Sequence, residues 1–250
     1  MKRTRLVPLI TFRRERLSIV QIAEQVTNFY KKLALVDNNH SQIYIVSEKK
    51  SKFQKIDIND DYASRHLAEE ILHQNIDEIS KMDKVKIPQL DFLFVKSIIS
   101  FGLETKAQDE SLLTFHFSFL DSDNLKSSIS NIVTNPNCFN TFEKAKLFLY
   151  TAEKSFGVDY SVIKISERDI NKVARGFKAP LGLITYFSND YEIPIPDDLE
   201  GIEYEHTDKG KYLILTRENV AEDEAKLEKA KQKLLKTMQE IADKVPEYIK

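Results

Sequence analysis

The sequence has one cysteine, no tryptophan and only six glycines among its 250 residues. The single cysteine, Cys138, excludes an intramolecular disulfide, so folding does not depend on an oxidising compartment. The glycines do not form a phosphate-binding loop, and the nucleophile elbow of hydrolases and the C-x-x-C redox pair are also absent. These absences remove the common signatures of nucleotide-binding, hydrolytic and redox enzymes. We therefore expect a protein that binds a partner, with no enzymatic activity and no cofactor.

The charges of the chain are nearly balanced, with 37 basic and 39 acidic side chains and a net charge of -2. So small a net charge creates no overall field that would draw the chain onto nucleic acid or an anionic membrane. No apolar run approaches the ~18 residues of a membrane span. The apolar run near the N-terminus is too short for a signal peptide and contains Pro8. We expect a cytoplasmic protein with no direct nucleic-acid or membrane partner.

The first half of the chain combines short strand patterns with two amphipathic helix patterns. Ser18 followed by Gln21 is a capping-box pair, and apolar residues then recur at helical spacing as far as Leu33. Asp60 and Asp61 begin a second helix, since acidic side chains favour the positive end of the helix dipole. The expected elements are strands at 6–12, 43–46 and 53–58, and helices from 18 to about 37 and from 60 to about 79.

The second half is richer in strand patterns. Apolar and polar residues alternate between Leu112 and Leu120, as in a strand with one buried face. Thr141 and Gly157 have the residue types that begin and end a helix, and they bracket an apolar helical stripe. The expected elements are strands at 92–95, 98–104, 112–120, 158–165, 181–188 and 211–216, a hairpin loop at 106–111, and helices at 142–156, 166–173 and 221–242.

This order of elements predicts an α+β fold, with a mostly antiparallel sheet and helices packed on one side. No linker rich in glycine or serine divides the chain, which favours a single domain over residues 1–250. The two halves nevertheless have a similar order of elements. Two related lobes, 1–135 and 136–250, therefore remain an alternative.

An acidic segment, residues 189–208, stands out by its charge. It contains eight acidic side chains and no lysine or arginine, and Pro194 and Pro196 stiffen it. Apolar residues alternate with the acids, so the segment would present a rigid anionic surface with apolar anchors to a basic partner. The alternative is a solvated connection between two strands. The residues expected to contact a partner are Asp190, Glu192, Asp197, Asp198, Glu200, Glu203 and Glu205.

A metal site has one candidate, formed by His66, Glu70 and His73. These residues would share one face of a helix, where they could converge on a divalent cation. Their spacing matches neither H-E-x-x-H nor H-x-x-E-H, so we interpret them as the solvated face of an amphipathic helix and expect no metal. We interpret Cys138 as a packed residue, not a reactive one.

Several segments together resemble the bacterial immunity protein 52 family. The first is the opening strand with Arg13-Arg14-Glu15 and the helix that Ser18 begins, and it continues to the short strand before Ser47-Glu-Lys-Lys-Ser51. The second is Gly182-Leu-Ile-Thr-Tyr-Phe187, which is similar to a Gly-Trp-Met-Thr-Tyr-Leu strand of that family. Gly210-Lys-Tyr-Leu-Ile-Leu-Thr216 and the final helix follow in the same order. The family is rich in tryptophan and this chain has none, so it would be a divergent member.

The resemblance implies an immunity protein of a polymorphic toxin system, in the setting of interbacterial competition and type VI secretion. Its partner would be a cognate toxin encoded by a neighbouring gene, with a nuclease as the expected target. The acidic segment would occlude the basic cleft of that nuclease. Two other functions remain open, a structural or adaptor protein of a secretion system and a metal-dependent hydrolase that uses His66, Glu70 and His73.

Overall fold

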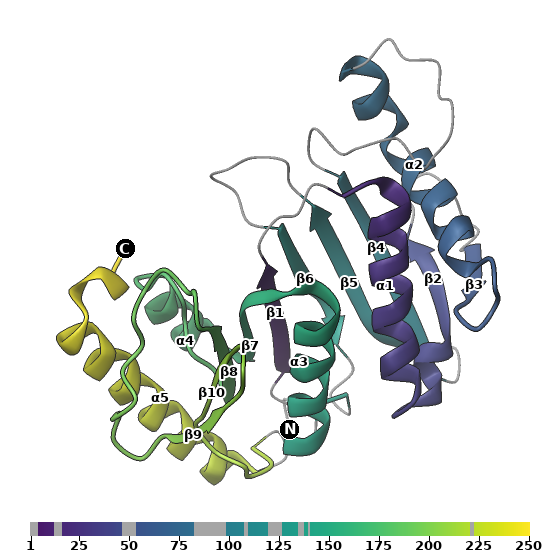
Figure 1. Ribbon diagram of the computed structural model, residues 1–250. Coiled ribbons are helices and arrows are strands. Elements are labelled where there is room, and N and C mark those ends of the chain that lie inside the picture. The colour runs from purple at the N-terminus through teal and green to yellow at the C-terminus, as the bar shows by residue number, and fades with distance from the viewer. Residues whose placement is uncertain are drawn as a thin grey trace. The chain divides into compact units, whose positions relative to one another are not determined.

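The computed structural model describes residues 5–12, 17–46, 54–82, 99–107, 110–119, 127–134, 138–139, 141–220 and 223–250 (Figure 1). The chain divides into two compact units. Unit 1 consists of Met1–Ile10, Thr134–Tyr150 and Val158–Lys250, and unit 2 consists of Thr11–Val133 and Thr151–Gly157. Each unit contains β-strands with helices packed against them.

Among its described residues, unit 2 contains five strands in the order β3-β2-β4-β5-β6. The pairings of β2 with β3, of β2 with β4 and of β4 with β5 are antiparallel. Two helices and a 3-10 turn are also among its described residues, together with residues 11–12 and 151–156. The bounds are α1 Ile19–Ala34, η1 Asn38–Ser41, β2 Gln42–Val46, β3 Gln54–Asp57, α2 Ala63–Met82, β4 Ile99–Ala107, β5 Glu110–Phe119 and β6 Ser127–Thr134.

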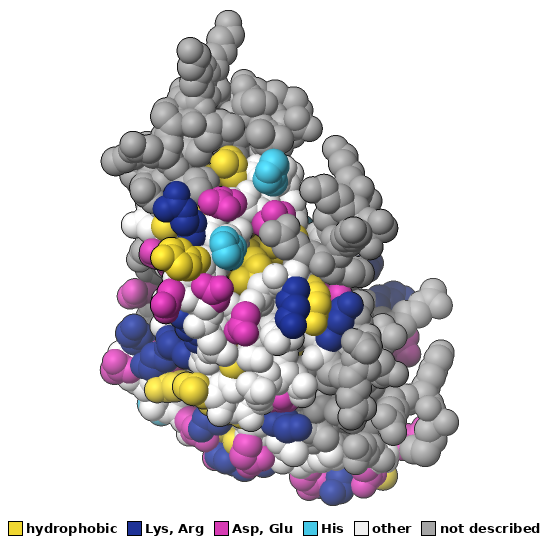
Figure 2. All heavy atoms as spheres, turned by 90° about the vertical axis from the view of Figure 1, so that its right-hand side faces the viewer, with side chains coloured by type: hydrophobic (Ala, Val, Ile, Leu, Met, Phe, Trp, Pro, Cys, Tyr) yellow, Lys and Arg dark blue, Asp and Glu magenta, His cyan; other side chains and the backbone are white. Residues whose placement is uncertain are grey.

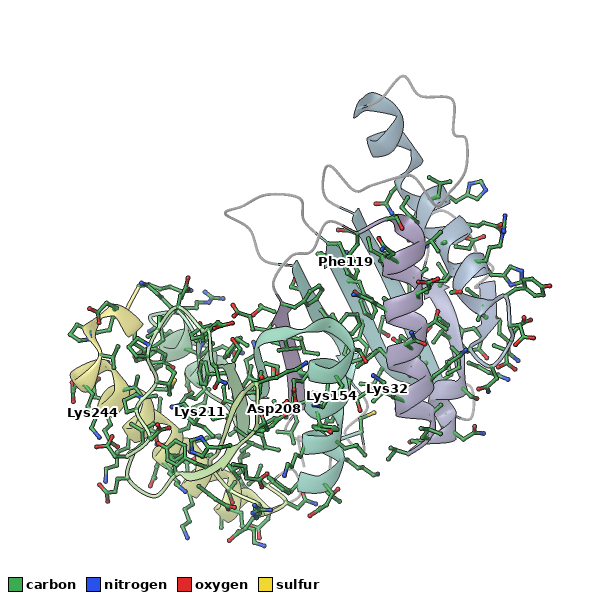
Figure 3. All side chains as sticks on the ribbon, viewed as in Figure 1. Lys32, Phe119, Lys154, Asp208, Lys211 and Lys244 are labelled. Atoms are coloured by element: carbon green, nitrogen blue, oxygen red, sulfur yellow. The ribbon has the colours of Figure 1, made fainter. Side chains whose placement is uncertain are left out.

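Helix α1 begins with the predicted capping box. The backbone N–H of Gln21 donates to Ser18 Oγ, and the N–H of Ser18 donates to Gln21 Oε1 at 2.8 Å. The apolar stripe of α1 is buried, and the ring of Tyr30 lies against Phe117 of β5. Lys32 on the exposed side of α1 donates to the carbonyl of Lys154 at 3.3 Å (Figure 3). The sequence pattern of this helix therefore fixes both its start and its buried face.

Phenylalanine rings form much of the core of unit 2. Phe101 of β4 stacks on Phe117 with ring centroids 5.1 Å apart, because the two residues lie opposite each other in the β4–β5 register. Phe12 and Phe156 stack at 5.3 Å, and Phe119 lies edge-on to Phe12 at 5.4 Å. These large buried rings supply apolar area in a chain without tryptophan.

Unit 1 contains the strands in the order β1-β7-β8-β10-β9. The pairings of β8 with β7 and β10, and of β10 with β9, are antiparallel. Consecutive residues of β7 and β8 are buried on both faces of the strands. The bounds are β1 Arg5–Phe12, α3 Phe142–Phe156, β7 Val158–Ser166, α4 Arg168–Ala174, β8 Ile184–Ser188, β9 Glu203–His206, β10 Gly210–Ile214, α5 Glu224–Lys244 and η3 Pro246–Tyr248.

The prediction of an α+β fold with a mostly antiparallel sheet is confirmed. Residues on both faces of β7 and β8 are buried. The expected hairpin loop at 106–111 is wrong at both ends, because β4 and β5 extend into it. Strands β6 and β9 were not predicted, and the expected strand at 92–95 lies outside the described residues. Across the described residues, none of the helices has the length and apolar character needed to cross a membrane.

Candidate functional site

The acidic segment begins after β8 and ends beyond β9. Its first part, residues 189–202, is an irregular connection that we call the strap. Three apolar side chains of the strap are buried, those of Ile193, Ile195 and Leu199. They anchor the strap to the core of unit 1, so they are not the exposed apolar contacts that we expected them to offer a partner.

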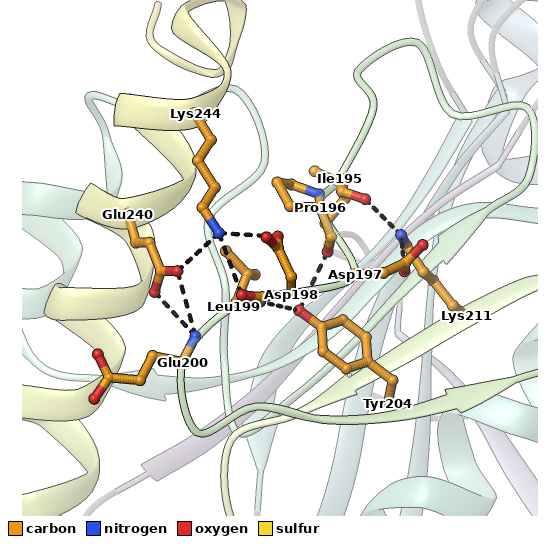
Figure 4. Close-up of polar contacts among 10 residues, drawn as sticks. All are labelled: Ile195, Pro196, Asp197, Asp198, Leu199, Glu200, Tyr204, Lys211, Glu240 and Lys244. Atoms are coloured by element: carbon orange, nitrogen blue, oxygen red, sulfur yellow. Dashed lines mark hydrogen bonds and ion pairs between the residues drawn. The ribbon is translucent and has the colours of Figure 1, made fainter.

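Lysines of α5 and β10 hold the carboxylates of the strap (Figures 3 and 4). Lys211 of β10 donates to Asp197 Oδ1 and to the carbonyl of Ile195, both at 2.5 Å. Lys244 of α5 donates to Asp198 Oδ1 at 2.9 Å. One lysine of α5 and one lysine of β10 therefore hold the strap.

Glu200 adds two further links between the strap and α5. Its carboxylate accepts from Lys236 at 2.7 Å, and its backbone N–H donates to the carboxylate of Glu240 at 3.1 Å (Figure 4). Glu240 in turn forms an ion pair with Lys244 at 3.1 Å. Lys236, Glu240 and Lys244 of α5 therefore all contact the strap or each other.

Tyr204 of β9 also forms hydrogen bonds with the strap. Its hydroxyl accepts a hydrogen bond from the backbone N–H of Leu199 at 3.0 Å and donates to the carbonyl of Pro196 at 3.2 Å (Figure 4). Burial raises the pKa of Tyr204, so the hydroxyl keeps the proton that it needs to donate. The strap is therefore tied to its own strand as well as to α5.

Three carboxylates of the strap, those of Asp197, Asp198 and Glu200, are accessible to solvent. A hydrogen bond from Lys244 lowers the pKa of Asp198, and a hydrogen bond from Lys236 lowers the pKa of Glu200. The side chains of Asp197, Asp198 and Glu200 are nevertheless 62%, 78% and 74% exposed. Each therefore presents a carboxylate to solvent in a position that its lysine partner restrains.

A second charged cluster covers the other face of β9. Glu203 and Glu205 point to the same side because side chains alternate along a strand. Arg217 donates two hydrogen bonds to Glu203 and one to Glu205 at 2.8 Å, and Lys146 of α3 also pairs with Glu205. The guanidinium of Arg217 lies over the ring of Phe142, 4.4 Å from its centroid. Cations from α3 and from the residues after β10 thus offset the two glutamates.

A small hollow lies beside this cluster and shares Phe142 with it. Its apolar lining comes from the start of α3, the start of β8 and the residues after β10, and it includes Leu183 and Val220. Its volume of about 20 Å³ is enough for about one water molecule. This hollow is too small to hold a metabolite.

Two of the predicted residues remain. Asp190 and Glu192 lie at the exposed start of the strap, on either side of the half-buried Tyr191. Burial raises the pKa of Tyr191, and the negative charges of Glu192 and Asp159 raise it further. The structure thus groups Asp197, Asp198 and Glu200 on one side of β9 and Glu203 and Glu205 on the other.

The three residues proposed as metal ligands on α2 do not converge. His66 and His73 are exposed, Glu70 is half-buried, and no three histidine, cysteine or acidic side chains converge on a metal position within the described ranges. Figure 2 shows acidic, basic and histidine side chains intermixed on one face of the molecule, with no patch of a single sign among the coloured atoms. Cys138 is half-buried.

The strand β9 and the cations that pair with the acidic segment were not predicted from the sequence. A signal for β9 was present, because Glu203 to His206 alternates acidic with aromatic and imidazole side chains before a turn and a second strand pattern. The cations carry no such local signal. Lys146 and Lys244 are 59 and 46 residues away from their acidic partners in the sequence.

Comparisons with known proteins add little to this geometry. No protein-family model and no curated protein matches the sequence. Among solved structures, the chain is similar to a Pseudomonas aeruginosa T6SS protein, with a TM-score of 0.47 and 9% identity over 92% of this chain and 76% of that one. A likeness at this TM-score supports no argument about function. The resemblance to the immunity protein 52 family stays a prediction from the sequence.

Proposed function

We propose that this chain is an immunity protein that binds a cognate bacterial toxin and neutralises it. The observation that carries the proposal is the exposure of Asp197, Asp198 and Glu200 on a segment that buried anchors hold in place. The expected target is a nuclease, whose cleft is basic because it binds phosphate groups. The segment resemblance to the immunity protein 52 family supports the same function.

A restrained anionic surface is well suited to this task. A free carboxylate loses side-chain entropy when it is fixed in a complex, whereas these carboxylates are already restrained by their lysine partners. An ionised carboxylate offers about four acceptor positions, so a carboxylate that one lysine holds can still accept hydrogen bonds from a partner. Negative charge at the rim of an interface accelerates encounter with a basic partner.

The same ion pairs also tie the strap to α5, so the experiment has to separate a binding role from a structural one. The pair of Asp198 with Lys244 allows this, because either residue can be neutralised. Asp198→Asn and Lys244→Gln break the same contact but change the surface charge in opposite directions. A structural role predicts equal effects of the two variants, and a role in binding predicts opposite effects.

We expect the product of the neighbouring toxin gene to bind the chain and co-expression to rescue cells from it. At low salt, Asp198→Asn should slow association several-fold and Lys244→Gln should accelerate it, with the difference shrinking at high salt. Glu24→Gln, which removes an exposed charge on α1, is the matched control and should leave the rate unchanged. Absence of binding and of rescue would overturn the proposed function. Equal slowing by both variants would show that the toxin does not bind at the strap.

A further inference from the structure

Strand β9 is the last strand in the order of unit 1, with β10 as its neighbour. The N–H of Thr207 donates to the carbonyl of Gly210 at 2.8 Å, which makes these two residues a hydrogen-bonded pair of the hairpin. Hydrogen-bonded and non-bonded pairs alternate along an antiparallel ladder. The register pairs Glu205 with Tyr212, two positions along from that pair. The backbone N–H and C=O groups of Glu205 therefore point toward β10.

The same alternation directs the backbone groups of Tyr204 and His206 away from β10. No strand among the described residues lies beyond β9 to accept them. The edge therefore offers two N–H donors and two carbonyl acceptors, spaced as a neighbouring strand would need them. This is the arrangement that an extended peptide uses when it adds to a sheet.

Both faces of this edge are already held in place. The ring of Tyr204 is fixed by its hydroxyl contacts with the strap, and Glu203 and Glu205 are fixed by Arg217 and Lys146. An incoming strand would therefore add to a preorganised edge, and the ordering cost of binding would fall mainly on the incoming segment.

The charges near β9 indicate which kind of strand would bind there. A second copy of this chain added antiparallel and centred on Tyr204 would place Glu203 opposite Glu205, and like charges directly opposite each other are destabilising. An extended segment with basic side chains would instead lie beside these glutamates, whose carboxylates keep acceptor positions besides those that Arg217 and Lys146 occupy. Charge complementarity thus favours a basic strand over a second copy.

We propose that β9 is a docking edge for an extended basic segment of a partner protein, which pairs with the backbone of Tyr204 and His206. This inference rests on the proposed function, in which that segment belongs to the toxin. It assigns to the neutralising surface a backbone contact in addition to its carboxylates.

Amide exchange and chemical shifts of the full chain test the proposal with two blocked hexapeptides as probes, one alternating lysine with valine and the other glutamate with valine. The lysine peptide should shift the amide signals of Tyr204 and His206 and slow their exchange, and the glutamate peptide should not. Equal effects of the two peptides, or no effect at these two amides, would overturn the inference.

The variants His206→Pro and His206→Ala separate the backbone from the side chain. Both remove the exposed imidazole, but only proline removes the outward N–H while leaving the ladder to β10 intact. His206→Pro should weaken binding of the lysine peptide at least 5-fold relative to His206→Ala, as a rough lower bound for losing one backbone hydrogen bond. Equal binding by the two variants would contradict the inference. If His206→Pro does not fold, the amide shifts and exchange rates of Tyr204 and His206 in the unaltered chain test the inference instead.

The toxin distinguishes failure of this inference from failure of the proposed function. A toxin that binds His206→Pro and His206→Ala equally well overturns the edge and leaves the immunity function standing. A lysine peptide that protects the edge in a chain that no toxin binds supports the edge and overturns the immunity function.

Discussion

Asp198 Oδ1 lies 2.9 Å from Lys244 Nζ, and this contact joins the strap to the last residue of α5. The next residue, Leu199, is buried in the core of unit 1. Two adjacent residues thus hold the strap in different ways, one by an exposed ion pair and one by burial of apolar area. These interactions differ in strength, and the difference leads to the first prediction.

Removal of a buried anchor should destabilise the protein far more than removal of an exposed ion pair. Leu199→Ala leaves a cavity and should lower the free energy of unfolding by about 2–5 kcal/mol. Asp198→Asn should leave the urea midpoint unchanged within error, because an exposed ion pair contributes little to stability. Urea unfolding of both variants checks this. A loss for Asp198→Asn as large as that for Leu199→Ala would contradict it.

His40 should make stability depend on pH. Burial lowers the pKa of His40 to about 4, while the charge of Asp37 opposes the shift. Because the folded-state pKa lies below the unfolded value of about 6.5, the stabilising contribution is complete above that value and is lost as the pH falls towards 4. The loss should reach about 3 kcal/mol, as an order of magnitude from 1.36 kcal/mol per pKa unit.

Urea unfolding at pH 7 and pH 4.5 measures this slope. His40→Gln should flatten it, since the substituted side chain does not titrate. His66→Gln replaces an exposed histidine on α2 and serves as the matched control. An unchanged slope in His40→Gln would assign the acid sensitivity to other groups.

Gly182 should not tolerate any side chain. A Cβ at this position would lie 2.1 Å from the carbonyl oxygen of Ile163 in β7, so one of two backbone segments would have to move. We expect Gly182→Ala to cost about 3 kcal/mol or more, at or above the upper end for overpacking. Gly157→Ala should cost only about 1–2 kcal/mol, since its φ of 58° is left-handed but no atom lies within 4 Å of the added Cβ. Thermal unfolding compares the two variants, and equal melting temperatures would contradict the prediction.

We expect the surface histidines of α2 to hold no metal. Protein purified without chelators should contain sub-stoichiometric zinc, nickel and manganese by mass spectrometry. Substitution of His66 and His73 by alanine should not change that content. Stoichiometric metal that is lost when both histidines are substituted would support the hydrolase alternative.

The sequence alone was sufficient for features that depend on neighbouring residues. Ser18 and Gln21 predicted the start of α1, and Thr141 and Gly157 predicted both ends of α3, because caps and the left-handed glycine act within one turn of a helix. Alternation in residues 112–120 predicted β5 for the same reason. These signals lie within a few residues of the structure that they specify.

Only the tertiary structure decided what the acidic segment does within the fold. The sequence showed eight acids without a local lysine or arginine, and this favoured an uncompensated anionic surface. The fold brings lysines and an arginine from α3, β10, α5 and the residues after β10 to five of those acids, and it buries three apolar residues of the strap. Such contacts join residues far apart in the chain, so no local pattern encodes them. The acidic character of the segment could therefore be predicted from composition. The ion pairs that restrain its carboxylates depend on how the chain folds back on itself.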